Sequence, residues 1–287
     1  MKLWTDRNGR LSYLKLAALA GALAPGAWIA GQLATGQLGP LPIEAVNDAT
    51  GRWAIRLLLL SLLVTPVQRI GNWPRLILVR RMLGIATLAY AAVHFCAFAL
   101  NQNLDLTRIV SEISQRVYLA IGLAGLSGLL VLGATSFDRV IRWMGYRWKI
   151  LHRAVYAIAS LGIVHFFLQA KIDATEPTLM AGFFILLMGY RLAIAIRVRL
   201  SPLAVALTGL AASAATAAAE YAWYGLATGV DPLAVLEANL AFPQSIRPAA
   251  VVLGAGIVMT AISAARSLRE GKGGVSVNRR FAGAARV

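Results

Sequence analysis

The sequence has very little cysteine, histidine or acidic residue. Its 287 residues include one cysteine, three histidines and 12 aspartates and glutamates. A lone cysteine, Cys96, excludes disulfides within the chain and metal clusters built from several thiolates. No strand followed by a glycine-rich loop and a helix occurs, which excludes a nucleotide-binding domain for flavin or nicotinamide. The three histidines, His94, His152 and His165, are therefore the first candidates for a functional site.

Long apolar segments dominate what is present. Hydrophobic residues make up 59% of the chain, charged residues 14%, and the mean hydropathy is +0.68. A helix needs about 20 mostly apolar residues to cross a membrane, and eight segments qualify. They are 11–33, 53–70, 82–100, 117–135, 149–170, 179–196, 203–228 and 249–265. We therefore predict an all-α, polytopic membrane helix bundle with about eight transmembrane helices.

The basic residues indicate the orientation of these helices. Lysine and arginine are concentrated at the start of the chain, between helices two and three, between four and five, after six, and in the tail. The intervening loops are neutral or acidic. Because short cytoplasmic loops accumulate positive charge, we expect both termini in the cytoplasm and helices three and five running outward. The net charge of +16 then reflects topology and contact with anionic lipid rather than nucleic-acid binding.

This topology assigns a depth to each histidine. His94 lies twelve residues after Met82, about 18 Å above the inner end of helix three. His165 is about 20 Å above the entrance of helix five near Ile150, whereas His152 stays near the cytoplasmic surface. His94 and His165 should therefore form a pair in the outer half of the membrane.

The chemistry of two imidazoles favours a haem. A bare transition metal usually recruits three or four ligands, often including carboxylates, and helices three and five carry no Asp or Glu at that depth. A haem needs only two axial ligands, and a helix bundle supplies apolar walls for the macrocycle. The alternative is that His94 and His165 only form hydrogen bonds between helices.

Three segments carry a resemblance to a known family. They are TGRWAIRLLLLSLLVTP (50–66), RRMLGIATLAYAAVHF (80–95) and TSFDRVIRWMGYRWKILHRAVYAIASLGIVHFFLQAK (135–171). Together they resemble the haem-binding membrane subunit of the bacterial periplasmic methionine-sulfoxide reductase, the MsrQ family, within the ferric-reductase-like transmembrane group. The resemblance covers 42–199. It divides the chain into a six-helix haem-binding domain (1–200), two additional helices (201–268) and a disordered basic cytoplasmic tail (269–287).

The resemblance implies a multi-pass b-type cytochrome of the bacterial inner membrane, active in electron transport. Such a protein accepts electrons from a cytoplasmic flavin reductase or quinone and passes them to a periplasmic molybdopterin reductase that repairs oxidised proteins. It implies haem b, one or two per chain, with FMN as a further candidate cofactor. The substrate-reducing chemistry belongs to the molybdenum subunit, so no catalytic residue is expected here.

The resemblance also distinguishes the histidines. His94 and His165 match the outer haem ligands, and His152 matches a third histidine proposed to serve an inner haem. Related ferric reductases have a further histidine one helical span earlier on helix three, where this chain has Arg80, fourteen residues before His94. His152 and His165 are thirteen residues apart, about 140° around an ideal helix, so both face one interior only if the helix is distorted. An interfacial role for His152 is the alternative.

Other functional classes leave two alternatives. A ferric or quinone reductase would use the same haem core with another acceptor. A transporter is disfavoured, because few charges lie in the spans and no pair of broken helices marks a midplane site.

Some other residues in the spans have expected roles outside the haem site. Gly122, Gly125 and Gly128 are expected to serve helix packing, and Glu220 is expected at the outer interface or in a proton relay. No repeat of fixed period is apparent.

Overall fold

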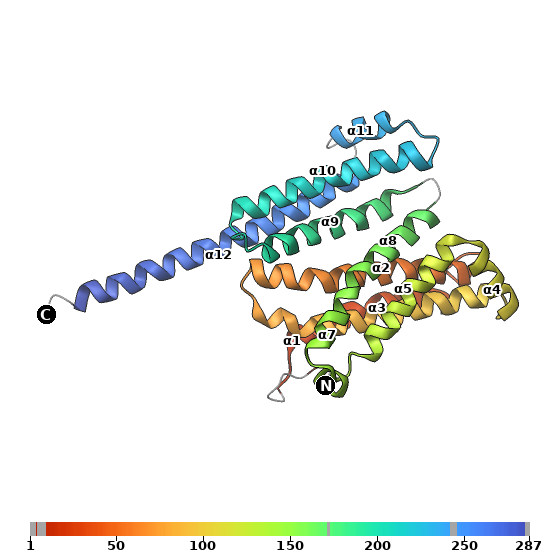
Figure 1. Cartoon of the computed structure of the whole chain (residues 1–287), viewed down its shortest axis with the longest axis horizontal. Coiled ribbons are helices and arrows are strands. Elements are labelled where there is room, and N and C mark those ends of the chain that lie inside the picture. The colour runs from red at the N-terminus through yellow and green to blue at the C-terminus, as the bar shows by residue number, and fades with distance from the viewer. Residues whose placement is uncertain (1–3, 5–9, 171–172, 242–245, 285–287) are drawn as a thin grey trace. The chain divides into compact units, whose positions relative to one another are not determined.

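The computed structural model is built from α-helices, as predicted. It describes residues 4, 10–170, 173–241 and 246–284, with the side chains after Glu270 left out. Eight of the described helices are long and apolar enough to cross a membrane, which confirms the predicted number (Figure 1). Because such a helix satisfies all its backbone hydrogen bonds internally, it is the natural form of an apolar segment in lipid.

The elements follow one another along the chain with short connections. The long helices are α1 (Tyr13–Ala34), α2 (Pro42–Ile70), α3 (Ile77–Asn101), α5 (Val117–Ala134), α8 (Val155–Gln169), α9 (Thr175–Ala195), α10 (Pro202–Ala227) and α12 (Pro248–Ala284). The short elements are η1 (Pro74–Leu76), α4 (Leu106–Gln115), α6 (Asp138–Met144), α7 (Tyr146–Leu151), η2 (His152–Ala154) and α11 (Pro232–Leu240). α7, η2 and α8 together form the fifth span.

Helix α2 begins eleven residues earlier than the predicted segment 53–70. Its first part, PIEAVNDATGR, is too polar to register as an apolar segment, yet it continues the same helix. Elsewhere the starts follow ordinary capping rules: the side chains of Ser12, Asp105, Ser201 and Asp231 each accept a hydrogen bond from a backbone N–H of the first turn. The early start of α2 matters because it adds residues that reach the functional site.

The chain forms two compact units. One contains residues 1–64 and 76–173, and the other contains 65–75 and 174–287. These units are groupings by packing, so the functional division at residues 200 and 268 stays a prediction. α12 continues to Ala284, but the side chains of the tail lie outside the described residues, and its disorder also stays a prediction.

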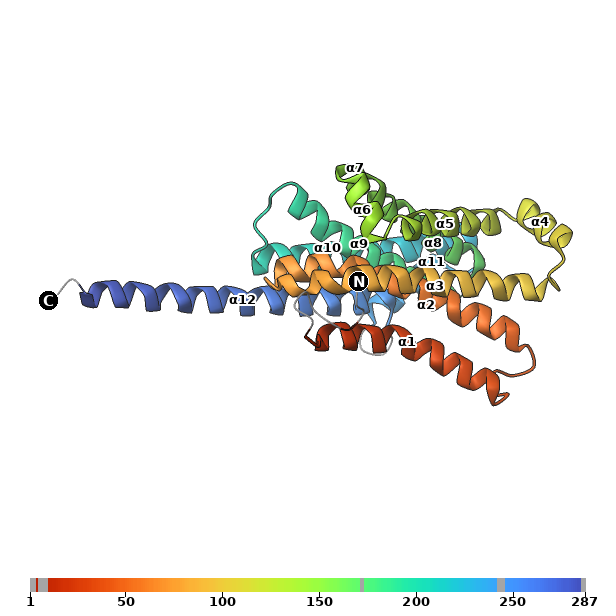
Figure 2. The same cartoon turned by 90° about the horizontal axis from the view of Figure 1, so that it is seen from below.

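In the first unit, α1 and α3 pack together, as do α3 and α5, and α5 and α8 (Figure 2). Ala22, Leu57 and Tyr90 form a buried cluster from α1, α2 and α3. The Tyr90 hydroxyl donates to the Ala22 carbonyl at 2.8 Å, so the polar end of this buried ring is satisfied. This packing holds α1, α2 and α3 together, and Tyr90 precedes His94 by one turn of α3.

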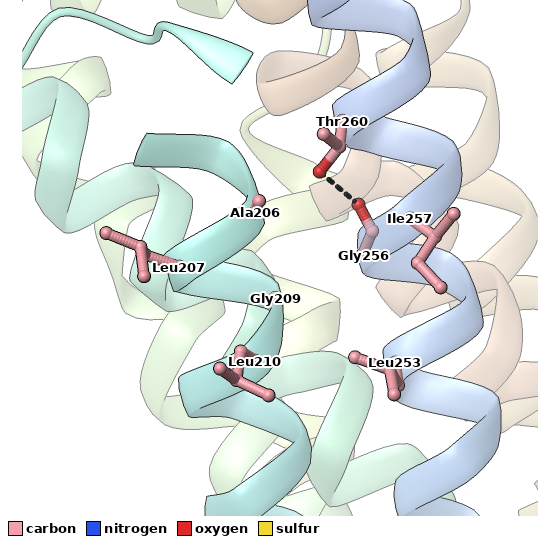
Figure 3. Close-up of a pocket in the computed structure, with 8 residues that line it drawn as sticks. All are labelled: Ala206, Leu207, Gly209, Leu210, Leu253, Gly256, Ile257 and Thr260. Atoms are coloured by element: carbon pink, nitrogen blue, oxygen red, sulfur yellow. Dashed lines mark hydrogen bonds between the residues drawn. The ribbon is translucent and has the colours of Figure 1, made fainter. Parts of the chain in front are cut away.

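In the second unit, α9, α10 and α12 lie side by side (Figure 1). Their core contains Tyr190, Val205 and Val252, each fully buried. α10 and α12 are in close contact where Gly209 faces Gly256. Beside this contact lies an apolar groove of ≈ 270 Å³ (Figure 3). The one hydroxyl in it, from Thr260, donates to the Gly256 carbonyl of its own helix at 2.8 Å, so the groove presents hydrocarbon to its surroundings.

Glu220 of α10 is fully buried rather than reaching water. Its carboxylate accepts hydrogen bonds from Arg247 at 2.6 Å and from Asn239 of α11 at 2.8 Å. Removing one partner of a buried ion pair leaves an uncompensated charge, so the network fixes α11 and the start of α12 against α10. The expectation that the Glu220 carboxylate reaches water was therefore wrong, whereas its depth at the outer interface and its role in a proton relay stay predictions.

The close contact of α10 and α12 yields a stability prediction. An added Cβ at Gly209 would lie 2.9 Å from the Gly256 Cα, and backbone cannot move as easily as a side chain. We expect Gly209→Ala to destabilise the protein by about 1–3 kcal/mol, measured as a lower thermal unfolding temperature in detergent. Gly254→Ala on α12 is the matched control, because nothing lies within 4 Å of its Cβ position. Equal unfolding temperatures for the two variants would contradict the assignment of Gly209 to this contact.

Candidate functional site

His94 of α3 and His165 of α8 face each other in the first unit. Their ring centres are 6.1 Å apart and their planes meet at 81°. Both side chains are partly buried. The structure therefore brings together the two histidines for which the sequence predicted a common depth.

Each of these imidazoles is hydrogen-bonded to the backbone of a neighbouring helix. His94 Nδ1 lies 2.8 Å from the carbonyl oxygen of Asn47 in α2, and His165 Nδ1 lies 2.7 Å from that of Tyr118 in α5. A carbonyl oxygen only accepts hydrogen bonds, so each neutral ring carries its proton on Nδ1. The lone pair is then on Nε2 in both rings. This arrangement is the usual one for histidines that bind a metal, because the second hydrogen bond fixes the tautomer and the ring orientation.

A glycine allows each ring to lie against the neighbouring helix. Gly51 is one turn after Asn47, and Gly122 is one turn after Tyr118. A Cβ at Gly51 would lie 2.9 Å from His94 Nδ1, and a Cβ at Gly122 would lie 2.9 Å from His165 Cε1. Gly122 therefore has the expected role in close packing of α5 on α8, and the group packed against it is the imidazole of His165.

These contacts repeat within the chain. Tyr118, Gly122 and His165 follow Asn47, Gly51 and His94 by the same 71 residues. In each set a carbonyl and a glycine from one helix hold a histidine of a later helix. The pairs α2–α3 and α5–α8 therefore hold their histidines by the same arrangement of carbonyl and glycine, although no repeat was apparent in the sequence.

The donor set fits a group that requires two axial imidazoles. Two rings bound to one ion at about 2 Å per bond have their centres roughly 6 Å apart, and the observed separation is 6.1 Å. Among the described residues, no group of three or more His, Cys, Asp or Glu side chains could hold a metal ion. A site of the zinc type is therefore not formed in that part of the chain, whereas a haem asks for two such ligands.

His152 lies in a separate group. Its ring stacks on Trp148 with centres 3.9 Å apart, Nδ1 is 3.1 Å from the Trp148 carbonyl, and Nε2 is 3.4 Å from Ser136 Oγ. Arg80 is close enough for its charge to act on this ring. The helix is distorted here, as the 3₁₀ turn η2 begins at His152. That His152 and His165 face one interior stays a prediction.

Arg81, the residue after Arg80, forms an ion pair with Asp138. Arg81 at the start of α3 donates to Asp138 of α6. This hydrogen bond and the positive charge of Arg81 lower the pKa of the Asp138 carboxyl. Both side chains are partly exposed, so the pair contributes little stability. The ion pair does link α6, which precedes His152 in the chain, to α3, which carries His94.

Four residues of the site were missed from the sequence: Asn47, Gly51, Tyr118 and Gly122. Asn47 and Tyr118 act on the imidazoles through backbone carbonyls, which leave no residue-type signature. One signal could have revealed the glycines, because each precedes its histidine by the same 43 residues.

The part of the chain that contains the histidine pair is similar to known proteins. Residues 50–163 match the family model for the ferric reductase like transmembrane component. The protein-methionine-sulfoxide reductase heme-binding subunit MsrQ of Rhodospirillum rubrum is 36% identical over 198 residues, which are 68% of this chain and 93% of that protein. The subunit of the same name from Agrobacterium fabrum is 39% identical over 171 residues, 59% of this chain and 79% of that protein. No solved structure matches the chain.

Proposed function

This chain belongs to the MsrQ family of haem-binding subunits of the protein-methionine-sulfoxide reductase, and we propose that it passes electrons through a haem held by His94 and His165. The observation that carries this proposal is the pair of Nδ1 hydrogen bonds to the backbone, which leave both Nε2 atoms for one shared iron. Haem b supplies an iron that accepts and releases one electron at a time.

The residues around the site keep the two ligands in place. The carbonyls of Asn47 and Tyr118 hold the imidazoles in the neutral tautomer, and the Nδ1 hydrogen bonds make the rings better donors to a metal. Gly51 and Gly122 let α2 and α5 approach the rings closely. Because the ligands are fixed in advance, little rearrangement is needed when an electron arrives or leaves.

We propose the bacterial inner membrane as the location and a route from the cytoplasmic to the periplasmic side. The donor would be a flavin reductase, with FMN, or a quinone, and the acceptor a periplasmic molybdopterin-containing methionine-sulfoxide reductase. The names of the relatives support a methionine-sulfoxide reductase as the acceptor, since each describes the heme-binding subunit of a protein-methionine-sulfoxide reductase. The basic residues between alternate helices support the orientation.

His152 and Arg80 are our candidates for a second, inner haem. Arg80 is near His152, which supports a shared role. Binding would require His152 Nε2 to turn away from Ser136, its present neighbour at 3.4 Å. The outer pair needs no such rearrangement, so the proposal for His94 and His165 stands independently of this one.

A ferric reductase with the same haem core is the second candidate function. It is favoured by the match of residues 50–163 to the ferric reductase like component. The two functions differ in the acceptor and not in the haem ligands.

The test is a transfer of electrons from the reduced protein. The purified, haem-loaded protein is reduced with limiting dithionite and mixed with a periplasmic methionine-sulfoxide reductase and its sulfoxide substrate. We expect the haem spectrum to return to the oxidised form at a rate that depends on the reductase concentration. Ferric citrate replaces the reductase in a parallel reaction. Reoxidation by ferric citrate alone would favour the second function, and a protein purified without haem would contradict both.

A further inference from the structure

Asn47 contacts His94 twice, with different groups. Its backbone carbonyl accepts from the imidazole Nδ1 at 2.8 Å, and its side-chain Nδ2 donates to the backbone carbonyl of His94 at 3.2 Å. One residue of α2 therefore holds both the ring and the main chain of one residue of α3. The second contact comes from the amide group, so it depends on the identity of residue 47.

The corresponding residue in the second half of the site lacks this contact. Tyr118 also accepts from its histidine through the backbone carbonyl, at 2.7 Å, and its ring centre lies 6.2 Å from that of His165. Its hydroxyl, however, accepts from Arg116 Nη1 at 3.2 Å and not from His165. The described contacts thus hold His165 by one hydrogen bond and His94 by two.

The second hydrogen bond restricts how His94 can leave an iron. The ring can withdraw Nε2 by turning about its own bonds, which breaks the Nδ1 contact, or by movement of α3 away from α2, which the Asn47 amide opposes. We propose that Asn47 is a positioning residue that makes His94 the more firmly held of the two axial ligands. This inference rests on the proposed function, because it presupposes a haem between His94 and His165.

Carbon monoxide is a suitable probe, since it binds a reduced six-coordinate haem only after one axial ligand has left. In the unmodified protein His165, with one hydrogen bond, is the ligand that leaves first. Without the Asn47 amide His94 also has one, so we expect Asn47→Leu to open a second route of similar rate and to bind carbon monoxide roughly 2-fold faster. Asn47→Asp has almost the same shape but no amide donor, so it should show the same acceleration. The measurement is flash photolysis or stopped-flow mixing of the dithionite-reduced, haem-loaded protein.

The control is Glu44→Gln, which removes a negative charge from an exposed position near the start of the same helix and leaves both Asn47 contacts in place. An unchanged carbon monoxide rate in this control, with acceleration in both Asn47 variants, supports the assignment. Wild-type rates in both Asn47 variants would overturn it, including the case where their thermal stability falls, because Asn47 would then serve helix packing alone. An unmodified protein without a six-coordinate haem would overturn the proposed function itself.

Discussion

Replacing His94 or His165 by alanine is expected to remove the outer haem from the purified protein. Each substitution deletes one of the two imidazoles, whose ring centres are 6.1 Å apart, and no third described side chain of the metal-binding type is grouped with them. Loss even of a residue that supports a ligand typically costs 10- to 100-fold in metal affinity, so loss of the ligand itself should cost at least roughly 100-fold. The measurement is haem per protein, with the reduced-minus-oxidised spectrum.

His152→Ala is the matched comparison for these two variants. His152 belongs to the separate group with Trp148 and Ser136, so the outer haem should remain and keep its low-spin spectrum. Full haem content in His94→Ala and His165→Ala would contradict the proposed ligand pair. Equal loss in all three variants would instead indicate a general effect on folding.

A single added methyl group at Gly51 or Gly122 is expected to have the second-largest effect. In Gly51→Ala the new Cβ would lie 2.9 Å from His94 Nδ1, and in Gly122→Ala it would lie 2.9 Å from His165 Cε1. The ring must then shift and weaken its hydrogen bond to the carbonyl of Asn47 or Tyr118. Since that bond orients the ligand, we expect a roughly 10- to 100-fold loss of haem affinity, measured by titration of haem into the haem-free protein.

Gly125→Ala provides the control on the same helix as Gly122. Nothing lies within 4 Å of its Cβ position, and alanine favours a helix more than glycine does. This variant should bind haem as the unmodified protein does. If Gly122→Ala also retained full affinity, the close approach of α5 to His165 would have no part in ligand binding.

The sequence predicted the number of spans well, because hydropathy measures the property that the membrane selects. Each of the eight predicted segments overlaps one of the eight spans and extends beyond it by at most two residues. The start of α2 was missed for the same reason: the polar residues 42–52 continue the helix but do not look like part of an apolar segment. Asn47 and Gly51 lie in this part, so the residues that support His94 were missed with it.

The sequence predicted the part of the site that depends on side-chain chemistry, which is the histidine pair. Depth along two helices predicted to run outward paired His94 with His165, and the structure places their rings together. The contacts that orient the rings come from main-chain oxygens, which have no residue-type signature, and from the absence of a side chain at Gly51 and Gly122. Glycine also has more than one use, as Gly128 packs against Ile158 on α8 while Gly122 accommodates an imidazole.

The repeat of the carbonyl, the glycine and the histidine after 71 residues makes the site resemble the interface of a symmetric dimer, in which two identical surfaces meet at one axis. Here both surfaces belong to a single chain, so the two halves are free to differ. Asn47 and Tyr118 are one such difference. A dimer of identical hairpins would have to change both of its ligands at once, whereas this chain can adjust the environment of one while it leaves the other as it was.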